Sequence, residues 1–143
     1  MGTDGQPLRD SSPSDVALRL VPRRVRAGVV ALSHAVRYGY PAPRLYEIRG
    51  QDMFMQRVRG PTMLTALMGG DLDLPAGLPP FWPTFCSACT VCCPRPGAGP
   101  GTRLVHLDLH PDNVILSSSG PTVIDWTNAR DGSPALDVVL CGR

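Results

Sequence analysis

The chain has 143 residues, which is enough for one domain of ordinary size and too few for two. Its net charge of +2 is too small to draw the whole molecule to nucleic acid or to anionic lipid, so neither partner is expected. The N-terminus lacks the apolar core of a secretory signal and no apolar run reaches the roughly 18 residues of a membrane helix, so we expect a cytoplasmic protein without membrane contact.

The first elements are a leader, a strand and a helix. Residues 1–14 are rich in Gly, Ser, Pro and Asp and are expected to be a disordered leader. Apolar residues alternate over 15–21, which predicts a half-buried strand. Apolar residues at helical spacing then predict an amphipathic helix over 23–38, which Gly39 can terminate.

A β-hairpin and a short helix are expected next. The hairpin has strands at 44–49 and 53–58 around the turn residues 50–52. The helix covers PTMLTALM, residues 61–68, and stops at the following pair of glycines. Residues 71–101 then concentrate Pro, Gly and Cys without helical or strand periodicity, so this segment is expected to be irregular.

A second hairpin is expected in the last third of the chain. The runs VIL and PTVID flank the turn SSSG, so two short strands should pair across it. Folding the second strand back along the first would bring Asn113 and Asp125 together.

Asp108, Asn113 and Asp125 form a set of polar residues suited to phosphoryl transfer. Asp108 and Asn113 are five positions apart, and Asp125 follows twelve positions later. Transfer from ATP needs one carboxylate to orient and deprotonate the attacking hydroxyl, with an amide oxygen and a second carboxylate to hold magnesium. The spacing therefore favours a loop that carries one base and two oxygen ligands.

Two motifs carry a family resemblance. HLDLHPDN resembles the catalytic loop of the protein-kinase-like superfamily, and VIDW resembles its metal-binding Asp segment, with Trp126 where protein kinases have Phe. His110 stands where protein kinases usually carry Lys, and this is similar to the aminoglycoside phosphotransferase and choline kinase branch. The resemblance implies ATP and Mg²⁺ as cofactors and transfer of the γ-phosphate to a small-molecule alcohol.

The same resemblance implies a role for each polar residue of the motifs. Asp108 would be the catalytic base, and His106 would be a structural member of the catalytic loop. Asn113 and Asp125 would be the magnesium ligands. Asp137, in the segment DGSPALDVV, would be a buried scaffold acid.

The implied fold is α+β, with two incomplete lobes of the protein-kinase-like type. Residues 15–70 would be a partial small lobe with the hinge and the following helix, and residues 102–143 would be the catalytic-loop and metal-Asp segment of the large lobe. Arg19 would take the place of the phosphate-binding Lys, and Gln56 to Val58 would lie where the adenine binds.

Other parts of such a kinase are missing from the sequence. The chain has no Lys, and its one Glu, Glu47, lies beyond the predicted helix, so the usual Lys–Glu pair cannot form. The leader has no G-x-G-x-x-G pattern. We therefore expect impaired activity, and a truncated or frame-disturbed member of the family in which residues 71–101 were not selected to fold.

Three other interpretations of the motif residues stay open. His106, Asp108 and His110 lie at alternate positions and could share one strand face as zinc ligands. The Asp and Asn residues could simply cap turns. The chain could also be a non-catalytic pseudoenzyme that still binds nucleotide.

A Cys-rich metal-binding module is a further alternative. Cys86, Cys89 and Cys92 keep a C-x2-C-x2-C spacing similar to an iron–sulfur ligand run. The fourth cysteine, Cys93, adjoins Cys92 and cannot easily point at the same cluster, so a thiol-rich linker is the other interpretation of this segment.

Overall fold

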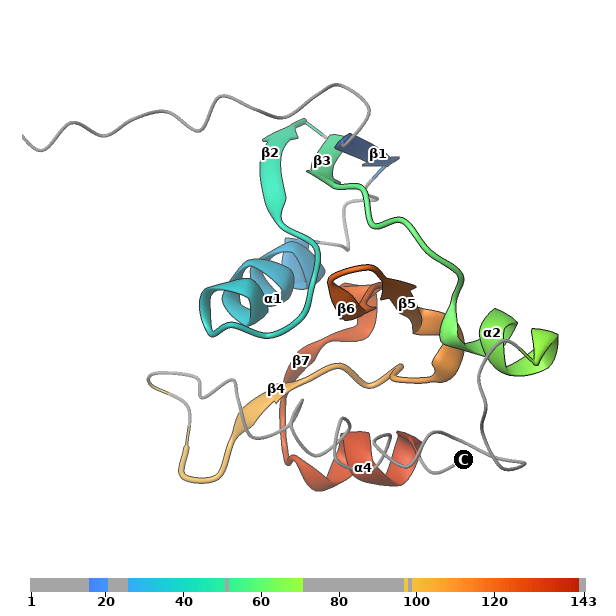
Figure 1. The fold of residues 1–143 in the computed structure, drawn as a ribbon. Coiled ribbons are helices and arrows are strands. Elements are labelled where there is room, and N and C mark those ends of the chain that lie inside the picture. The colour runs from blue at the N-terminus through green and yellow to red at the C-terminus, as the bar shows by residue number, and fades with distance from the viewer. Residues whose placement is uncertain (1–15, 21–25, 51, 71–96, 98, 142–143) are drawn as a thin grey trace, which may run out of the picture.

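The fold is known from a computed structural model that describes residues 16–20, 26–50, 52–70, 97 and 99–141. In this part of the chain, short helices accompany small antiparallel sheets (Figure 1), so the α+β class is confirmed. None of the described helices is both long enough and apolar enough to span a bilayer. The predicted leader and the cysteine cluster lie outside the described residues.

The first sheet contains the predicted strand and hairpin. Its strands are β1 (Val16–Leu20), β2 (Leu45–Arg49) and β3 (Asp52–Gln56), and β3 lies between the other two. β3 ends two residues before the predicted 58, at Gln56, whose N–H bonds to the carbonyl of Arg44 at 2.7 Å. Both strands of the hairpin are confirmed.

Helix α1 (Arg26–Arg37) packs its apolar side into the core. Val29, Leu32 and Ala35 are buried, as expected from their helical spacing. The helix ends one residue before the predicted 38. Gly39 terminates it as predicted, because this residue adopts a φ of 76° and the next N–H, that of Tyr40, bonds back to the carbonyl of Ala35.

The second hairpin pairs β5 (Val114–Ser117) with β6 (Gly120–Val123), which confirms the prediction. The chain that leaves β3 crosses this hairpin, where the Leu116 N–H bonds to the carbonyl of Pro61. It then enters α2 (Met63–Gly69).

Helix α2 starts two residues later than predicted because of its cap. The hydroxyl of Thr62 accepts a hydrogen bond from the Thr65 N–H, which places Thr62 outside the helix as its N-cap. Gly70 ends the helix in the left-handed region, with a φ of 71°.

Two further strands and one further helix were not predicted. β4 (Arg103–Val105) pairs with β7 (Arg130–Gly132), so the chain returns beside the strand that enters the catalytic loop. Helix α4 (Ala135–Cys141) comes next. It carries apolar side chains that are about half exposed, among them Val138 and Val139.

One apolar core joins the two halves of the chain. Buried residues of α1 and β3 pack with buried residues of the catalytic loop and the second hairpin. Trp126 lies at this junction, where its ring meets Tyr40 edge-on at 5.4 Å and its indole N–H bonds to the carbonyl of Val123. The site described next is therefore held by both halves.

Candidate active site

The predicted catalytic loop connects β4 to β5 and ends in a short 3-10 helix, η3 (Pro111–Asn113). Pro111 suits the first position of a helix, because its φ is already fixed and it has no N–H to leave unpaired. The Asn113 N–H closes this turn on the carbonyl of His110 at 2.9 Å. The loop thus has a defined conformation between two paired strands.

Asp108 and Asn113 are in direct contact. The side-chain amide of Asn113 donates to the backbone carbonyl of Asp108 at 2.9 Å and approaches the Asp108 carboxylate at 3.3 Å. The Asp108 side chain is 41% exposed. Its carboxylate can therefore still accept a hydrogen bond from a molecule that arrives from solvent.

The second hairpin brings Asn113 and Asp125 together at its open end, as predicted. Val114 pairs with Val123, and one step further the Ile124 N–H bonds to the carbonyl of Asn113 at 2.9 Å. Asp125 follows with a φ of 60°, which is uncommon for a residue other than Gly. Its carboxylate accepts a 2.6 Å hydrogen bond from the hydroxyl of Thr127.

Thr127 is a residue that the sequence interpretation missed. Its hydroxyl fixes one oxygen of Asp125. A carboxylate has two oxygens with about four acceptor positions in all. This bond therefore fixes the direction of the Asp125 carboxylate. A hydroxyl two residues after an Asp is a common turn pattern and could have been noticed.

His106 is a structural residue. It is 2% exposed, and burial lowers the pKa of its ring, although the Ile124 carbonyl and nearby carboxylates act in the opposite direction. The Asp108 N–H donates to Nδ1 at 3.3 Å, so Nε2 must carry the proton that it donates to the carbonyl of Ile124 at 3.0 Å. Both ring nitrogens are engaged, which excludes His106 as a zinc ligand in this conformation.

Asp137 binds the backbone at the start of the predicted catalytic loop. It is 1% exposed, which confirms the predicted buried acid. Its two carboxylate oxygens accept the N–H groups of His106 at 2.8 Å and Leu107 at 2.7 Å. Leu107 has a φ of 64°, which is costly for a residue with a branched side chain, so these bonds maintain a strained backbone directly before Asp108.

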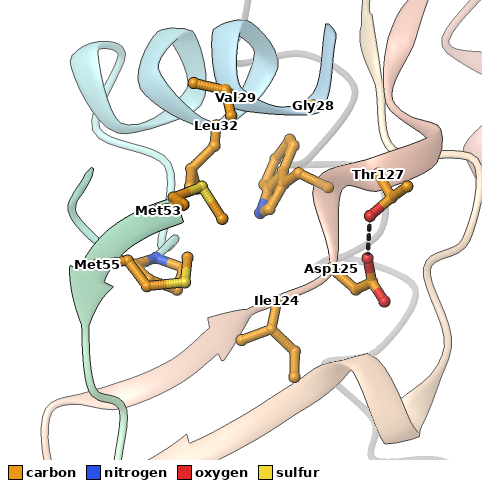
Figure 2. A pocket seen from close by; sticks show the side chains of 10 residues that line it. Gly28, Val29, Leu32, Met53, Met55, Ile124, Asp125 and Thr127 are labelled. Atoms are coloured by element: carbon orange, nitrogen blue, oxygen red, sulfur yellow. Dashed lines mark hydrogen bonds between the residues drawn. The ribbon is translucent and has the colours of Figure 1, made fainter. Parts of the chain in front are cut away.

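A narrow apolar pocket lies between α1, β3 and the Asp125 segment (Figure 2). Met53 and Met55 line it from β3, while Asp125 and Thr127 lie on the opposite side. Its volume is about 20 Å³, which is room for about one water molecule. This pocket does not accept a nucleotide base in the described conformation.

A wider, open cleft lies beside the catalytic loop. Its volume is about 330 Å³, and its described lining residues are Leu107, Asn128, Arg130 and Leu136. This volume falls in the range of small-molecule sites. These lining residues lie up to 29 positions apart in the sequence, so the cleft forms only when the chain folds.

The three residues predicted to bind nucleotide lie on the first sheet or just beyond it. Arg19 is in β1, opposite Met53. Gln56 ends β3, and its side-chain oxygen accepts from the Arg44 N–H at 3.3 Å. Val58 follows in the connection to α2 and is half-buried.

The one Glu of the chain is paired within its own strand. Glu47 lies on β2, exposed, and pairs with Arg49 at 2.7 Å. The hydrogen bond from Arg49 lowers the pKa of the Glu47 carboxyl. On α1, Gly28 packs against the backbone after Asp125, where an added Cβ would lie 2.7 Å from the carbonyl of Trp126.

Comparison with known proteins agrees with the resemblance seen in the motifs. Residues 69–143 match the model of the phosphotransferase enzyme family. Over 34 residues the chain is 47% identical to thiamine kinases of Salmonella paratyphi B, Salmonella newport and Salmonella heidelberg. That stretch is 24% of this chain and 12% of each of these kinases, so the chain spans only a small part of their length.

Proposed function

Because the chain belongs to the phosphotransferase enzyme family, we propose that it binds ATP with Mg²⁺ and transfers the γ-phosphate to a hydroxyl group of a small molecule. The observation that carries this proposal is that Asn113 contacts Asp108 through its side chain and is bonded through its backbone carbonyl to Ile124, the residue before Asp125. A carboxylate base beside two oxygen ligands is the set that phosphoryl transfer requires.

Asp108 is the proposed base. Its carboxylate is partly exposed, and the strained backbone before it is held by Asp137. It would accept the proton of the acceptor hydroxyl while that oxygen bonds to the γ-phosphorus and the bond to the ADP oxygen breaks. The position of the carboxylate therefore depends on a buried anchor outside the loop.

Asn113 and Asp125 are the proposed ligands of the cation. Magnesium prefers carboxylate and amide oxygens, so the chemistry of this pair is suitable. When bound, the cation would neutralise charge on the phosphates. Thr127 orients the Asp125 carboxylate, and the backbone bond between Ile124 and Asn113 keeps the two ligand residues adjacent.

For the nucleotide we propose the hinge segment from Gln56 to Val58 as the adenine site and Arg19 as a phosphate contact. A guanidinium suits phosphate oxygens through its planar, forked donors. In this proposal residues 15–70 belong to the small lobe of a kinase-like fold and residues 102–143 to the large lobe.

The proposed acceptor is a small alcohol. The relatives that match over the 34 residues are named thiamine kinases, so thiamine is the first alcohol to test. The open cleft is a space of suitable size, and Leu107, the residue before the proposed base, is part of its lining.

A second candidate is a pseudoenzyme that binds nucleotide without transferring phosphate. The absence of Lys and the pairing of Glu47 with Arg49 favour it. Losing one preorganised donor to a developing charge costs roughly 3–4 kcal/mol, or two to three decades of rate. The proposal of a Cys-rich metal module would be tested separately, by metal analysis before and after Cys89→Ser.

Calorimetric titration with Mg-ATP tests the nucleotide site. We expect binding by the unaltered protein and a loss of binding in Asp125→Asn, because the carboxylate charge is removed while the shape stays. Asp112→Asn is the matched control, since Asp112 is an exposed acid of the same loop. Phosphate transfer to thiamine then separates enzyme from pseudoenzyme. Absence of binding at millimolar Mg-ATP would refute both candidates.

A further inference from the structure

His110 contacts both residues of the proposed loop chemistry. Its Nε2 lies 3.1 Å from the side-chain nitrogen of Asn113 and 3.6 Å from a carboxylate oxygen of Asp108. The imidazole is 47% exposed, so it reaches these partners from the solvent side of the loop.

The amide of Asn113 determines which ring nitrogen of His110 can carry the proton. The nitrogen of this amide carries two hydrogens and no acceptor. One hydrogen goes to the carbonyl of Asp108 at 2.9 Å, and the remaining hydrogen has two acceptors in reach, Nε2 of His110 at 3.1 Å and the Asp108 carboxylate at 3.3 Å. For the 3.1 Å contact to be a hydrogen bond, Nε2 must be the acceptor and the ring proton must be on Nδ1.

We infer that His110 is a positioning residue: its Nε2 accepts the second amide hydrogen of Asn113 and so fixes the direction of the amide oxygen. With both hydrogens held on the Asp108 side, the oxygen of Asn113 must face the other way. This inference rests on the proposed function where it assigns that oxygen to a cation.

The imidazole also leaves the Asp108 carboxylate with more capacity to accept other hydrogen bonds. Without an acceptor at position 110, the second hydrogen of Asn113 would turn fully to the Asp108 carboxylate, which it already approaches at 3.3 Å. That carboxylate would then have less capacity to accept a substrate hydroxyl. His110 thus prevents the Asn113 amide from occupying the Asp108 carboxylate, although the two residues are in contact.

A cation at position 110 would act differently. Lys has three donors and no acceptor, so it cannot receive a hydrogen from Asn113. Gln can place a carbonyl oxygen near the position of Nε2 and can receive it. The variants His110→Gln and His110→Lys therefore separate an acceptor role from a cationic role.

The test measures Mn²⁺ affinity in the presence of ATP, by electron paramagnetic resonance, together with ¹⁵N NMR of the imidazole and of the Asn113 amide in the metal-free protein. We expect His110→Leu and His110→Lys to weaken Mn²⁺ binding by about tenfold or more, the usual effect of losing a residue that orients a ligand. His110→Gln should stay close to the unaltered protein. His34→Gln, which replaces a histidine of α1, is the control.

The NMR measurement judges the contact without reference to function. We expect an unprotonated Nε2 and Asn113 amide resonances that shift in His110→Leu but are retained in His110→Gln. If the unaltered protein binds no Mn²⁺ with ATP, the proposed function fails and these resonances alone decide the contact. A protonated Nε2, equal affinity in all three variants, or binding kept by Lys and lost with Gln would overturn the inference.

Discussion

Replacing Asp137 by Asn should destabilise the protein by about 3 kcal/mol. The carboxylate is 1% exposed and accepts two backbone N–H groups at 2.8 and 2.7 Å. Asn keeps one acceptor oxygen but presents an NH₂ group to the other N–H, so one buried donor is left unpaired, at about 1–3 kcal/mol. The remaining bond loses its charge assistance, which adds about 1 kcal/mol.

Urea unfolding followed by circular dichroism measures this change. With a slope of about 2 kcal/mol per molar urea, the midpoint should fall by about 1.5 M. Asp112→Asn, at an exposed position, should stay within about 0.5 kcal/mol of the unaltered protein. A loss below about 1 kcal/mol in Asp137→Asn would refute the idea that this carboxylate holds the strained backbone at Leu107.

Two further outcomes follow from buried groups. Burial lowers the pKa of His106 from 6.5, so as the pH falls the unfolded chain takes up a proton before the folded protein does. The free energy of unfolding should therefore decrease below about pH 6.5, by up to about 1.4 kcal/mol per pH unit. Urea midpoints across this range should show a smaller slope in His106→Gln, and an unchanged slope would contradict the assignment. Gly28→Ala should destabilise the protein in thermal unfolding: about 1 kcal/mol of helix propensity favours Ala, but contact with the Trp126 carbonyl at 2.7 Å should cost about 1–3 kcal/mol. A raised melting temperature would contradict this, because it would mean that the backbone near Trp126 can move away from the added Cβ without loss of stability.

Local signals were sufficient for much of this fold. α1 combines apolar residues at helical spacing with a terminating Gly39, and both hairpins have apolar runs around turn residues. The loop that resembles a catalytic loop was noticed because its polar residues have a fixed spacing, and its catalytic role stays a prediction. The contact between Asp108 and Asn113, and the pairing that brings Asp125 to them, follow from that spacing and from the second hairpin.

The elements that were missed depend on tertiary contacts. β7 is three residues long and contains two charged residues and a glycine, so only its pairing with β4 makes it a strand. In α4 the apolar Leu136, Val138 and Val139 are partly exposed while the acid Asp137 is buried, which is the reverse of an amphipathic pattern. The two N–H groups that require this acid are thirty residues away, beyond the reach of any local rule.

The turn of the second hairpin lies at the opposite end from the residues of the proposed site. Asn113 and Asp125 are held at the open end, whereas the turn at Ser117 to Gly120 closes through its own hydrogen bonds at the far end. Doubling the length of a loop costs only about 0.6 kcal/mol in closure entropy. This turn can therefore be lengthened at little cost, for example to insert a label, whereas a single deletion inside either strand would shift the register and separate the two proposed ligand residues.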